Sequence, residues 1–430
     1  MMLLLFPTPK RGIASKHDGG NMMDAFLWYS STLIMLALLL LLAARAFQEL
    51  LGIQLIDLMR WRKAIRFLSP SRWPWPLVLI VSLAVLWLGS FAAYAALKGP
   101  GGFFQHFWLR FTKAGDASHY LFIAEHGYVS SGEEINKIVF FPLYPLLIGM
   151  LGRLLGGHFA LAGLIVSQAS YGASAVMLLR LAKLDSKHPD TVLLAYWLYP
   201  LGFFCLGVFS EGLFLLLTIL GFYFIRTRRW ILAGIAGLLC ALTRTQGVLL
   251  LLPGVYCAWQ DCRKSGWNWR YLALLGSAAG FGIYLVINRI VCGDFFAYLY
   301  YESAAPWWQT AQWLGDTVVQ QWNMALNHPS LASWIYWPQL LLYYIIAALL
   351  FWGYRRRLKT DYILYGTAYL GMCYTPSWLI SGCRYLYGCV PAYLCIGSIK
   401  SRYARIAVLA AELVACAMFY TWYMQGQAIM

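Results

Sequence analysis

Charged residues are scarce in this chain. Asp, Glu, Lys and Arg make up 12% of its 430 residues, whereas a soluble domain carries about 25%. Hydrophobic residues account for 61%. The scarcity of charge excludes an ordinary soluble domain and predicts an all-α polytopic membrane protein.

Several motifs are also missing. The ten cysteines form no Cys-x-x-Cys pair and no Cys/His metal spacing, so we interpret them as buried thiols. There is no P-loop, no Gly-x-Gly-x-x-Gly before a helix, no His-Glu-x-x-His and no Gly-x-Ser-x-Gly, so no nucleotide site is recognisable. A transferase facing outward would therefore need an activated donor that is carried in the membrane. The absence of an Asn-x-Ser/Thr sequon favours a bacterial plasma membrane.

Long hydrophobic runs are abundant, and no internal repeat divides them. We predict one membrane domain over 77–430, preceded by an extra span with a basic amphipathic helix over 25–76 and by a tail over 1–24. The segments of spanning or near-spanning length are 25–44, 77–97, 140–155, 159–181, 192–209, 212–225, 230–242, 247–258, 271–291, 338–354, 361–380, 385–399 and 406–424.

The tail carries charges that do not suit its predicted position. Lys10, Arg11 and Lys16 would lie on the outer side if segment 25–44 spans the membrane. The codons of the Gly-Gly pair at 19–20 can form a ribosome-binding site just upstream of a start codon. We therefore expect translation to begin at Met22 or Met23, which N-terminal sequencing would test.

The formal net charge of +16 would by itself suit a nucleic-acid partner. The basic residues instead lie in short clusters between apolar runs, which is the pattern of cytoplasmic loops, so we expect no nucleic-acid binding. These clusters are 45–72, 180–187, 226–229, 263–270, 355–359 and 400–405. With the clusters in the cytoplasm, the other polar segments fall on the opposite face. They are 98–139, 210–212, 243–245, 292–337 and 381–384.

One stretch conflicts with this topology. If the loop before it is outside and the basic loop 182–191 is inside, segments 140–155 and 159–181 cannot both cross once. Either 140–155 is re-entrant or lies on the surface, or 182–191 is not cytoplasmic. Pro142 and Pro145 favour a short, bent segment at 140–155.

The polar loop 98–139 contains an acid/base pair. Asp116 and His119 lie three residues apart, which places them on one side of a helical turn. An ionised carboxylate at the membrane surface can take a proton from a sugar hydroxyl as that oxygen attacks. His119 would orient the carboxylate or bind a leaving phosphate. The alternative is a solvated loop Asp beside an interfacial His.

Three further charged residues interrupt apolar sequence. Glu211 lies between two apolar runs, where a charged residue usually faces a cavity or a partner, the alternative being an exposed turn. Arg244 interrupts the apolar stretch 230–259, so it binds either a carboxylate such as Glu211 or a phosphate, which its planar fork suits. Arg384 follows segment 361–380 and either has the same role or extends to the membrane interface.

Five motifs occur in a defined order. They are Asp116-x-x-His119-Tyr120-Leu-x-Ile-Ala-x-x-Gly127-Tyr128, Phe140-Phe-Pro-Leu-Tyr-Pro145, Ser210-Glu211-Gly-Leu-Phe214, Leu242-Thr-Arg244-x-x-Gly247, and Arg384-Tyr385 with Pro391 downstream. In this order they resemble the PIG-V-like mannosyltransferases, which act in GPI-anchor synthesis and have bacterial relatives. The resemblance covers about residues 77–424. A sixth match at 293–298, with Trp307 following, lacks the proline that the family usually has at 295.

The resemblance implies a GT-C membrane glycosyltransferase fold. This would be a bundle of about 11–13 transmembrane or re-entrant helices, with short surface helices in the outer first loop. The active site would face the non-cytoplasmic side of the plasma membrane. A hexose, usually mannose in this family, would move from a polyprenyl-phosphate donor to a lipid or glycan acceptor with inversion.

The resemblance also implies roles for single residues. Asp116 would be the general base with His119 beside it, and Arg244 and Arg384 would bind the donor phosphate. The residues that would shape the pocket are Glu211, Tyr120, Tyr385 and Trp307. No cofactor and no divalent metal would be required. Besides its two substrates, the protein would contact membrane lipids.

Two other classes of function stay open from the sequence. A transporter or flippase for lipids or lipid-linked sugars would also carry buried charges, but it would be expected to show internal pseudo-symmetry, which we do not find. A non-catalytic partner in envelope assembly would keep the fold without activity. The presence of both Asp116 and Arg244 disfavours a non-catalytic protein.

Overall fold

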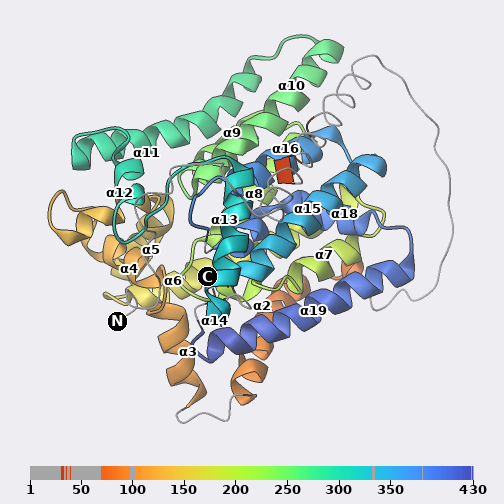
Figure 1. The fold of residues 1–430 in the computed structure, drawn as a ribbon. Coiled ribbons are helices and arrows are strands. Elements are labelled where there is room, and N and C mark those ends of the chain that lie inside the picture. Colours follow the sequence, from red (N-terminus) through yellow and green to blue (C-terminus); the bar gives the residue numbers. More distant parts are fainter. Residues whose placement is uncertain are drawn as a thin grey trace, which may run out of the picture.

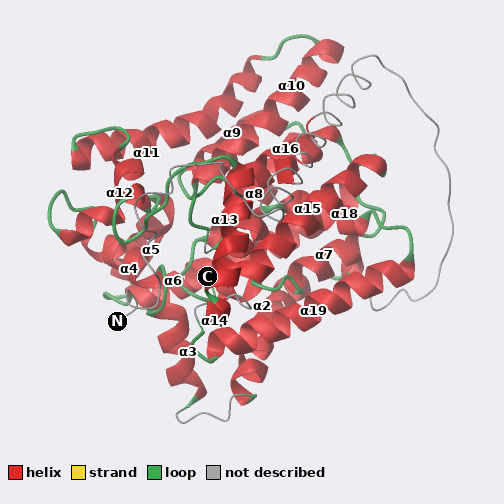
Figure 2. Ribbon diagram, in the orientation of Figure 1, coloured by secondary structure: helices red, strands yellow, loops and turns green. Residues whose placement is uncertain are grey.

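The computed structural model describes residues 31, 32, 35, 39, 69–96, 102–331, 335–379, 381–427 and 429. Within these residues the chain forms helices joined by loops and contains no strand (Figures 1 and 2). The all-α prediction is therefore confirmed for the described part. The predicted tail 1–24, its expected start codon and most of segment 25–76, with its extra span and basic amphipathic helix, lie outside these residues.

Five helices are long and apolar enough to cross a bilayer. They are α2 (Trp75–Ala95), α6 (Phe159–Asp185), the η6–α11 helix (Trp269–Cys292), α15 (Trp337–Arg355) and α19 (Arg402–Met424). They have 19 to 27 residues, and about 20 span a hydrocarbon core. Their outer surfaces are apolar, since Leu88 of α2 and Val414 of α19 are 68% and 67% exposed. This confirms the prediction of a helical chain with several apolar spans.

Most of the other apolar segments fold as shorter helices. They are α7 (Pro189–Trp197), α8 (Glu211–Arg226), α9 (Trp230–Ala241), α10 (Leu251–Ser265), α16 (Thr360–Cys373) and α18 (Val390–Gly397). The 16 residues of α8 extend about 24 Å, which is short of a core of about 30 Å. Hydropathy shows that these segments are apolar but does not show where each helix ends. Of the 11–13 helices expected, only the five above, or six with a bent pair, are shown as candidate spans in the described part.

The bent pair lies in the stretch whose predicted topology was in conflict. η3 (Glu133–Val139) and α5 (Leu143–Leu154) meet at 113°. α5 has only 12 residues, so it is too short to cross alone. Pro142 precedes its first residue and Pro145 lies in its first turn, where proline costs no intrahelical hydrogen bond. The short, bent segment that the two prolines favour is therefore present, and a bent pair of this kind is either a broken span or a re-entrant loop.

α6 is a central helix of the bundle, because α2, α5, α7 and α8 all pack against it (Figure 1). Buried tyrosines fill the space beside it. The rings of Tyr171 in α6 and Tyr196 in α7 stack 5.2 Å apart, and Tyr387 stacks on Tyr196 at 5.4 Å. Tyr387 belongs to η8 (Leu386–Gly388), so this stack ties the C-terminal third of the chain to α6 and α7.

A buried ionic network joins three helix ends away from these tyrosines. Arg226, at the end of α8, lies 2.9 Å from Asp185 Oδ2 at the end of α6 and donates to Asp361 Oδ2, at the start of α16, at 2.9 Å. Lys359 Nζ lies 2.5 Å from Asp185 Oδ1. Both aspartate side chains are 2% exposed. The residues of this network lie in three of the basic clusters or directly beside one. The sequence predicts that these three clusters lie on the same face of the membrane.

Removing the central cation of this network should destabilise the fold. Arg226→Ala leaves Asp185 with Lys359 and the Tyr362 hydroxyl, and it leaves Asp361 without its ion-pair partner. Breaking a buried pair by removing one partner costs about 3–5 kcal/mol. We expect a clearly lower thermal midpoint for the purified protein in detergent, whereas the exposed Arg180→Ala should leave the midpoint unchanged. Equal midpoints for the two variants would show that the network contributes little.

Candidate active site

Four charged side chains from distant segments meet in the structure. Asp116 precedes α4 (Ala117–His126), Glu211 begins α8, Arg244 precedes η5 (Thr245–Leu250), and Arg384 lies in α17 (Gly382–Tyr385). Arg384 Nη2 binds Asp116 Oδ2, and Arg244 Nη2 binds Glu211 Oε1. Arg384 Nε also lies 2.6 Å from Glu211 Oε1, as an ionic contact without hydrogen-bond alignment. Two carboxylates and two guanidinium groups thus form one continuous cluster, which we call the charged quartet.

Burial distinguishes the members of the charged quartet. The side chains of Glu211 and Arg384 are 3% and 4% exposed, whereas the side chain of Asp116 is 24% exposed. Arg384 is therefore not an interfacial residue that extends to water, and that alternative is wrong. Arg244 binds Glu211, which was the first of its two predicted partners. Asp116 is the member that an incoming hydroxyl group would reach most easily.

Close packing of α8 on α6 fixes Glu211 and its neighbour Ser210. A Cβ atom at Gly212 would lie 2.6 Å from the carbonyl oxygen of Ser167, so only glycine permits this approach. Ser210 Oγ accepts a hydrogen bond from Arg244 Nε at 2.9 Å and lies 2.9 Å from the hydroxyl of Tyr120. Tyr120, expected to shape the pocket, therefore contacts the charged quartet through Ser210.

Hydrogen bonds from other segments of the chain fix the short helix that carries Arg384. The hydroxyl of Tyr199 donates to the carbonyl of Cys383 at 2.6 Å, and the Gly382 amide donates to Gln339 Oε1 at 3.0 Å. The guanidinium lies 5.0 Å from the ring centre of Phe204 and 5.7 Å from that of Tyr385. Aromatic faces attract a guanidinium, so they help to stabilise it away from water.

The turn before α4 places Asp116. Gly115 has φ of +58°, a left-handed conformation that glycine adopts without strain. The preceding helix α3 (Phe103–Thr112) is fastened to the end of α19, because the Tyr423 hydroxyl donates to the carbonyl of Arg110 at 2.6 Å. The polar loop of the sequence is thus folded against the membrane helices at this point.

The protonation states follow from this environment. Burial raises the pKa of Asp116, but the Arg384 guanidinium, helped by His119 and Arg244, outweighs burial and holds this pKa below its ordinary value. Asp116 is therefore ionised at neutral pH. Burial lowers the pKa of His119, against the opposing effect of Asp116, so the imidazole is neutral there.

His119 lies beside the charged quartet without a hydrogen bond to it. Its ring stacks on Phe140 at 5.0 Å and meets the edge of Trp307 at 5.2 Å. Its Nδ1 atom is buried and has no hydrogen-bond partner among the described residues. The predicted orientation of Asp116 by His119 is thus not seen as a direct contact.

Trp307 reaches this position because its loop is tied to the segment before α17. The amide of Gln312 donates to the carbonyl of Thr375 at 2.8 Å, and the amide of Ser377 donates to the carbonyl of Thr310 at 2.7 Å. The loop between α12 (Ala297–Ser303) and α13 (Leu314–Asn327) therefore covers His119. Seven of the eight residues that the sequence assigned to the site lie in or next to the charged quartet, and Trp307 lies one contact further away, against His119.

Three contributing residues were not assigned from the sequence. Ser210 binds Arg244, Phe204 lies against Arg384, and the ring centre of Phe209 is 5.5 Å from the same guanidinium. Ser210 could have been found from its position beside Glu211. The two phenylalanines belong to an apolar run that resembles any other buried segment, so nothing in the sequence indicated that they contact Arg384.

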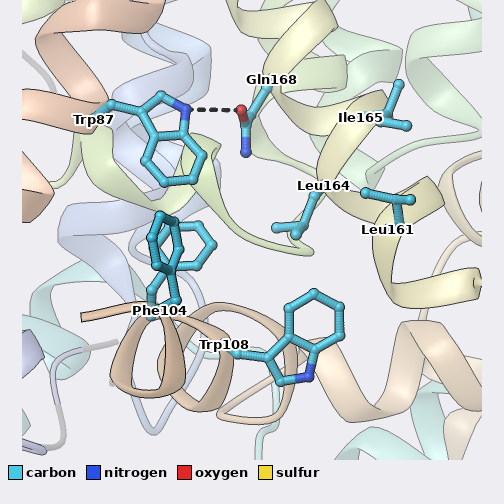
Figure 3. A pocket seen from close by; sticks show the side chains of 8 residues that line it. Trp87, Phe104, Trp108, Leu161, Leu164, Ile165 and Gln168 are labelled. Atoms are coloured by element: carbon cyan, nitrogen blue, oxygen red, sulfur yellow. Dashed lines mark hydrogen bonds between the residues drawn. The ribbon is translucent and has the colours of Figure 1, made fainter. Parts of the chain in front are cut away.

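The space inside the charged quartet is narrow. The gap bounded by Glu211, Arg244, Arg384 and Tyr385 is too small for a water molecule. A larger, apolar cavity of about 280 Å³ lies between α2, α3 and α6. Figure 3 shows Trp87, Phe104 and Trp108 facing Leu161 and Leu164 across it, with the Trp87 indole donating to Gln168 Oε1 at 3.1 Å. The residues that line this cavity are mainly apolar, whereas the charged quartet consists of two carboxylates and two guanidinium groups.

No protein-family model and no curated protein matches this chain. The residues of the site itself indicate what it can do. Its chemistry combines an accessible, ionised carboxylate with two guanidinium groups that can bind an anion. Among the described residues there is no group of three or more His, Cys, Asp and Glu side chains that could hold a metal ion.

Proposed function

We propose that this protein is a membrane glycosyltransferase of the GT-C type. It moves a hexose, mannose by resemblance to the PIG-V-like family, from a polyprenyl-phosphate donor to a lipid or glycan acceptor. The reaction takes place on the non-cytoplasmic face of a bacterial plasma membrane. The observation that carries the proposal is the direct contact of Asp116 with Arg384, continued through Glu211 to Arg244.

This contact supports an inverting displacement at the anomeric carbon. The acceptor oxygen attacks that carbon while its proton passes to Asp116, which is ionised and the most accessible of the four side chains. The bond between the anomeric carbon and the phosphate oxygen breaks, and its electron pair stays on the phosphate. Arg244 and Arg384 stabilise the charge that grows on that oxygen, with planar forks that match a phosphate. A single displacement needs one base and no second carboxylate as nucleophile.

The membrane setting supports a lipid-linked donor. Three of the five candidate spans, α6, α11 and α15, pack against the elements that carry Glu211, Arg244 and Arg384, so a substrate with a polyprenyl chain can approach from the bilayer. The apolar cavity between α2, α3 and α6 offers hydrocarbon contacts of the same kind.

The proposal is tested by a transfer assay. Membranes containing the full chain are incubated with radiolabelled polyprenyl-phosphate mannose, and labelled lipid and glycan products are separated and counted. We expect label to move from the donor to an acceptor in these membranes and not in matched membranes without the protein. If no label moves with mannose, glucose or galactose donors, the transferase proposal is wrong.

Arg244 is expected to act mainly in donor binding. A hydrogen bond to a charged group contributes about 1.5–3 kcal/mol, so Arg244→Ala should raise the KM for the donor roughly 10- to 100-fold. The exposed Lys264→Ala serves as the matched control and should leave this KM unchanged. Donor titrations with both variants measure the effect. An unchanged KM for Arg244→Ala would assign this residue to structure alone.

A further inference from the structure

Glu211 occupies the position that a phosphate oxygen would take between the two arginines. Its Oε1 atom binds Arg244 Nη2 and lies 2.6 Å from Arg384 Nε. Its Oε2 atom is buried and has no hydrogen-bond partner among the described residues. Carboxylate and phosphate groups match the same planar guanidinium fork. Glu211 and a bound phosphate therefore use the same donors.

The charge balance makes these two anions competitors. Asp116 and Glu211 carry two negative charges and Arg244 and Arg384 two positive ones, so the charged quartet is neutral without substrate. A phosphodiester donor adds one negative charge to it. A buried charge without a partner is strongly unfavourable. Phosphate can bind well only if it takes guanidinium contacts from a carboxylate.

Asp116 and Glu211 differ in how easily they give up these contacts. Asp116 is 24% exposed, so water can solvate it when Arg384 turns to a phosphate. Glu211, the first residue of α8, is 3% exposed, and water cannot replace its ionic partners. The Glu211 carboxylate therefore continues to attract both guanidinium groups while phosphate is bound.

We propose that Glu211 competes with the carrier phosphate for Arg244 and Arg384 and so drives release of the spent carrier. The inference rests on the proposed function for the identity of the ligand. In the transfer step the acceptor proton goes to Asp116, and the electron pair of the broken bond goes to the phosphate. The product is a polyprenyl phosphate monoester, whose second pKa is about 6 and which carries two negative charges at pH 8. Glu211 repels this product more strongly than the singly charged donor.

The inference is tested by binding polyprenyl phosphate to the full protein in detergent at pH 8, followed by quenching of tryptophan fluorescence. Glu211→Gln removes the competing charge and keeps the side-chain shape. We expect it to lower the Kd for polyprenyl phosphate about tenfold or more. Glu211→Asp keeps the charge and should stay within about threefold of the unmodified protein. Equal or weaker binding by a folded Glu211→Gln protein would overturn the inference.

A second measurement uses the unmodified protein and is independent of the folding of any variant. Polyprenyl methyl phosphate, a singly charged diester, should bind at least as tightly at pH 8 as the doubly charged monoester. Tenfold tighter binding of the monoester would overturn the inference.

The two proposals fail in different ways. Sugar transfer with unchanged phosphate affinity in Glu211→Gln removes the role of Glu211 and keeps the transferase. Tighter phosphate binding in Glu211→Gln without sugar transfer in any assay keeps the competition and removes the transferase. No binding of polyprenyl phosphate to either protein overturns the inference.

Discussion

Asp116→Asn should nearly abolish sugar transfer while leaving the protein inserted in the membrane. Asn has the shape of Asp, and its carbonyl oxygen can still accept a hydrogen bond from Arg384. The amide has no useful basicity, so it cannot take the proton of the acceptor hydroxyl. A positioned general base contributes about 10²–10⁴-fold to a rate, and we expect a loss in this range. The measurement is the initial rate of label transfer in membranes with matched amounts of protein.

The matched control for this experiment is Glu125→Gln. Glu125 is an exposed carboxylate on α4, the helix that follows Asp116, and its replacement should leave the rate unchanged. Full turnover by Asp116→Asn would show that another group accepts the proton and that the base assignment is wrong.

Arg384→Ala should cause the largest loss of stability in the charged quartet. Arg384 binds Asp116 and contacts Glu211, so the alanine variant leaves one guanidinium for two carboxylates. Removing one partner of a buried pair costs about 3–5 kcal/mol. The variant also loses the contacts of the guanidinium with Phe204 and Tyr385. We expect a marked fall in the thermal midpoint in detergent together with loss of transfer.

Two comparisons separate stability from function at this position. Arg384→Lys keeps the positive charge but lacks the planar fork, so it should recover part of the stability and still transfer slowly. Arg402→Ala, an exposed residue at the start of α19, should match the unmodified protein in both measurements. A thermal midpoint of Arg384→Ala equal to that of Arg402→Ala would contradict the structural role.

The charged residues of the site show how far sequence reasoning reaches. In an apolar chain an isolated ionised side chain must find a partner, so Glu211 and Arg244 could be singled out and their pairing anticipated. The partner of Asp116 could not be found in this way. Asp116 and Arg384 are 268 positions apart, and nothing local in the sequence links them. The network of Arg226 with Asp185 and Asp361 was missed for the same reason.

The helix lengths show a second limit. Hydropathy located nearly every apolar segment, yet α7, α9 and α18 have only 9, 12 and 8 residues. A segment that is buried inside the protein can be apolar without crossing the bilayer, because its backbone is covered by other helices. Sequence periodicity does not distinguish the two cases.

By itself, the sequence determined the class of this protein, because the ratio of apolar to charged residues decides whether water or lipid surrounds a chain. It also determined which side chains have to be paired or face a ligand, since an unpaired charge is costly in that environment. Only the tertiary structure decided which charges pair and which of them remains accessible. Those properties depend on contacts between helices far apart in the chain, such as the close approach of α8 to α6 at Gly212, where a Cβ atom would lie 2.6 Å from a carbonyl oxygen.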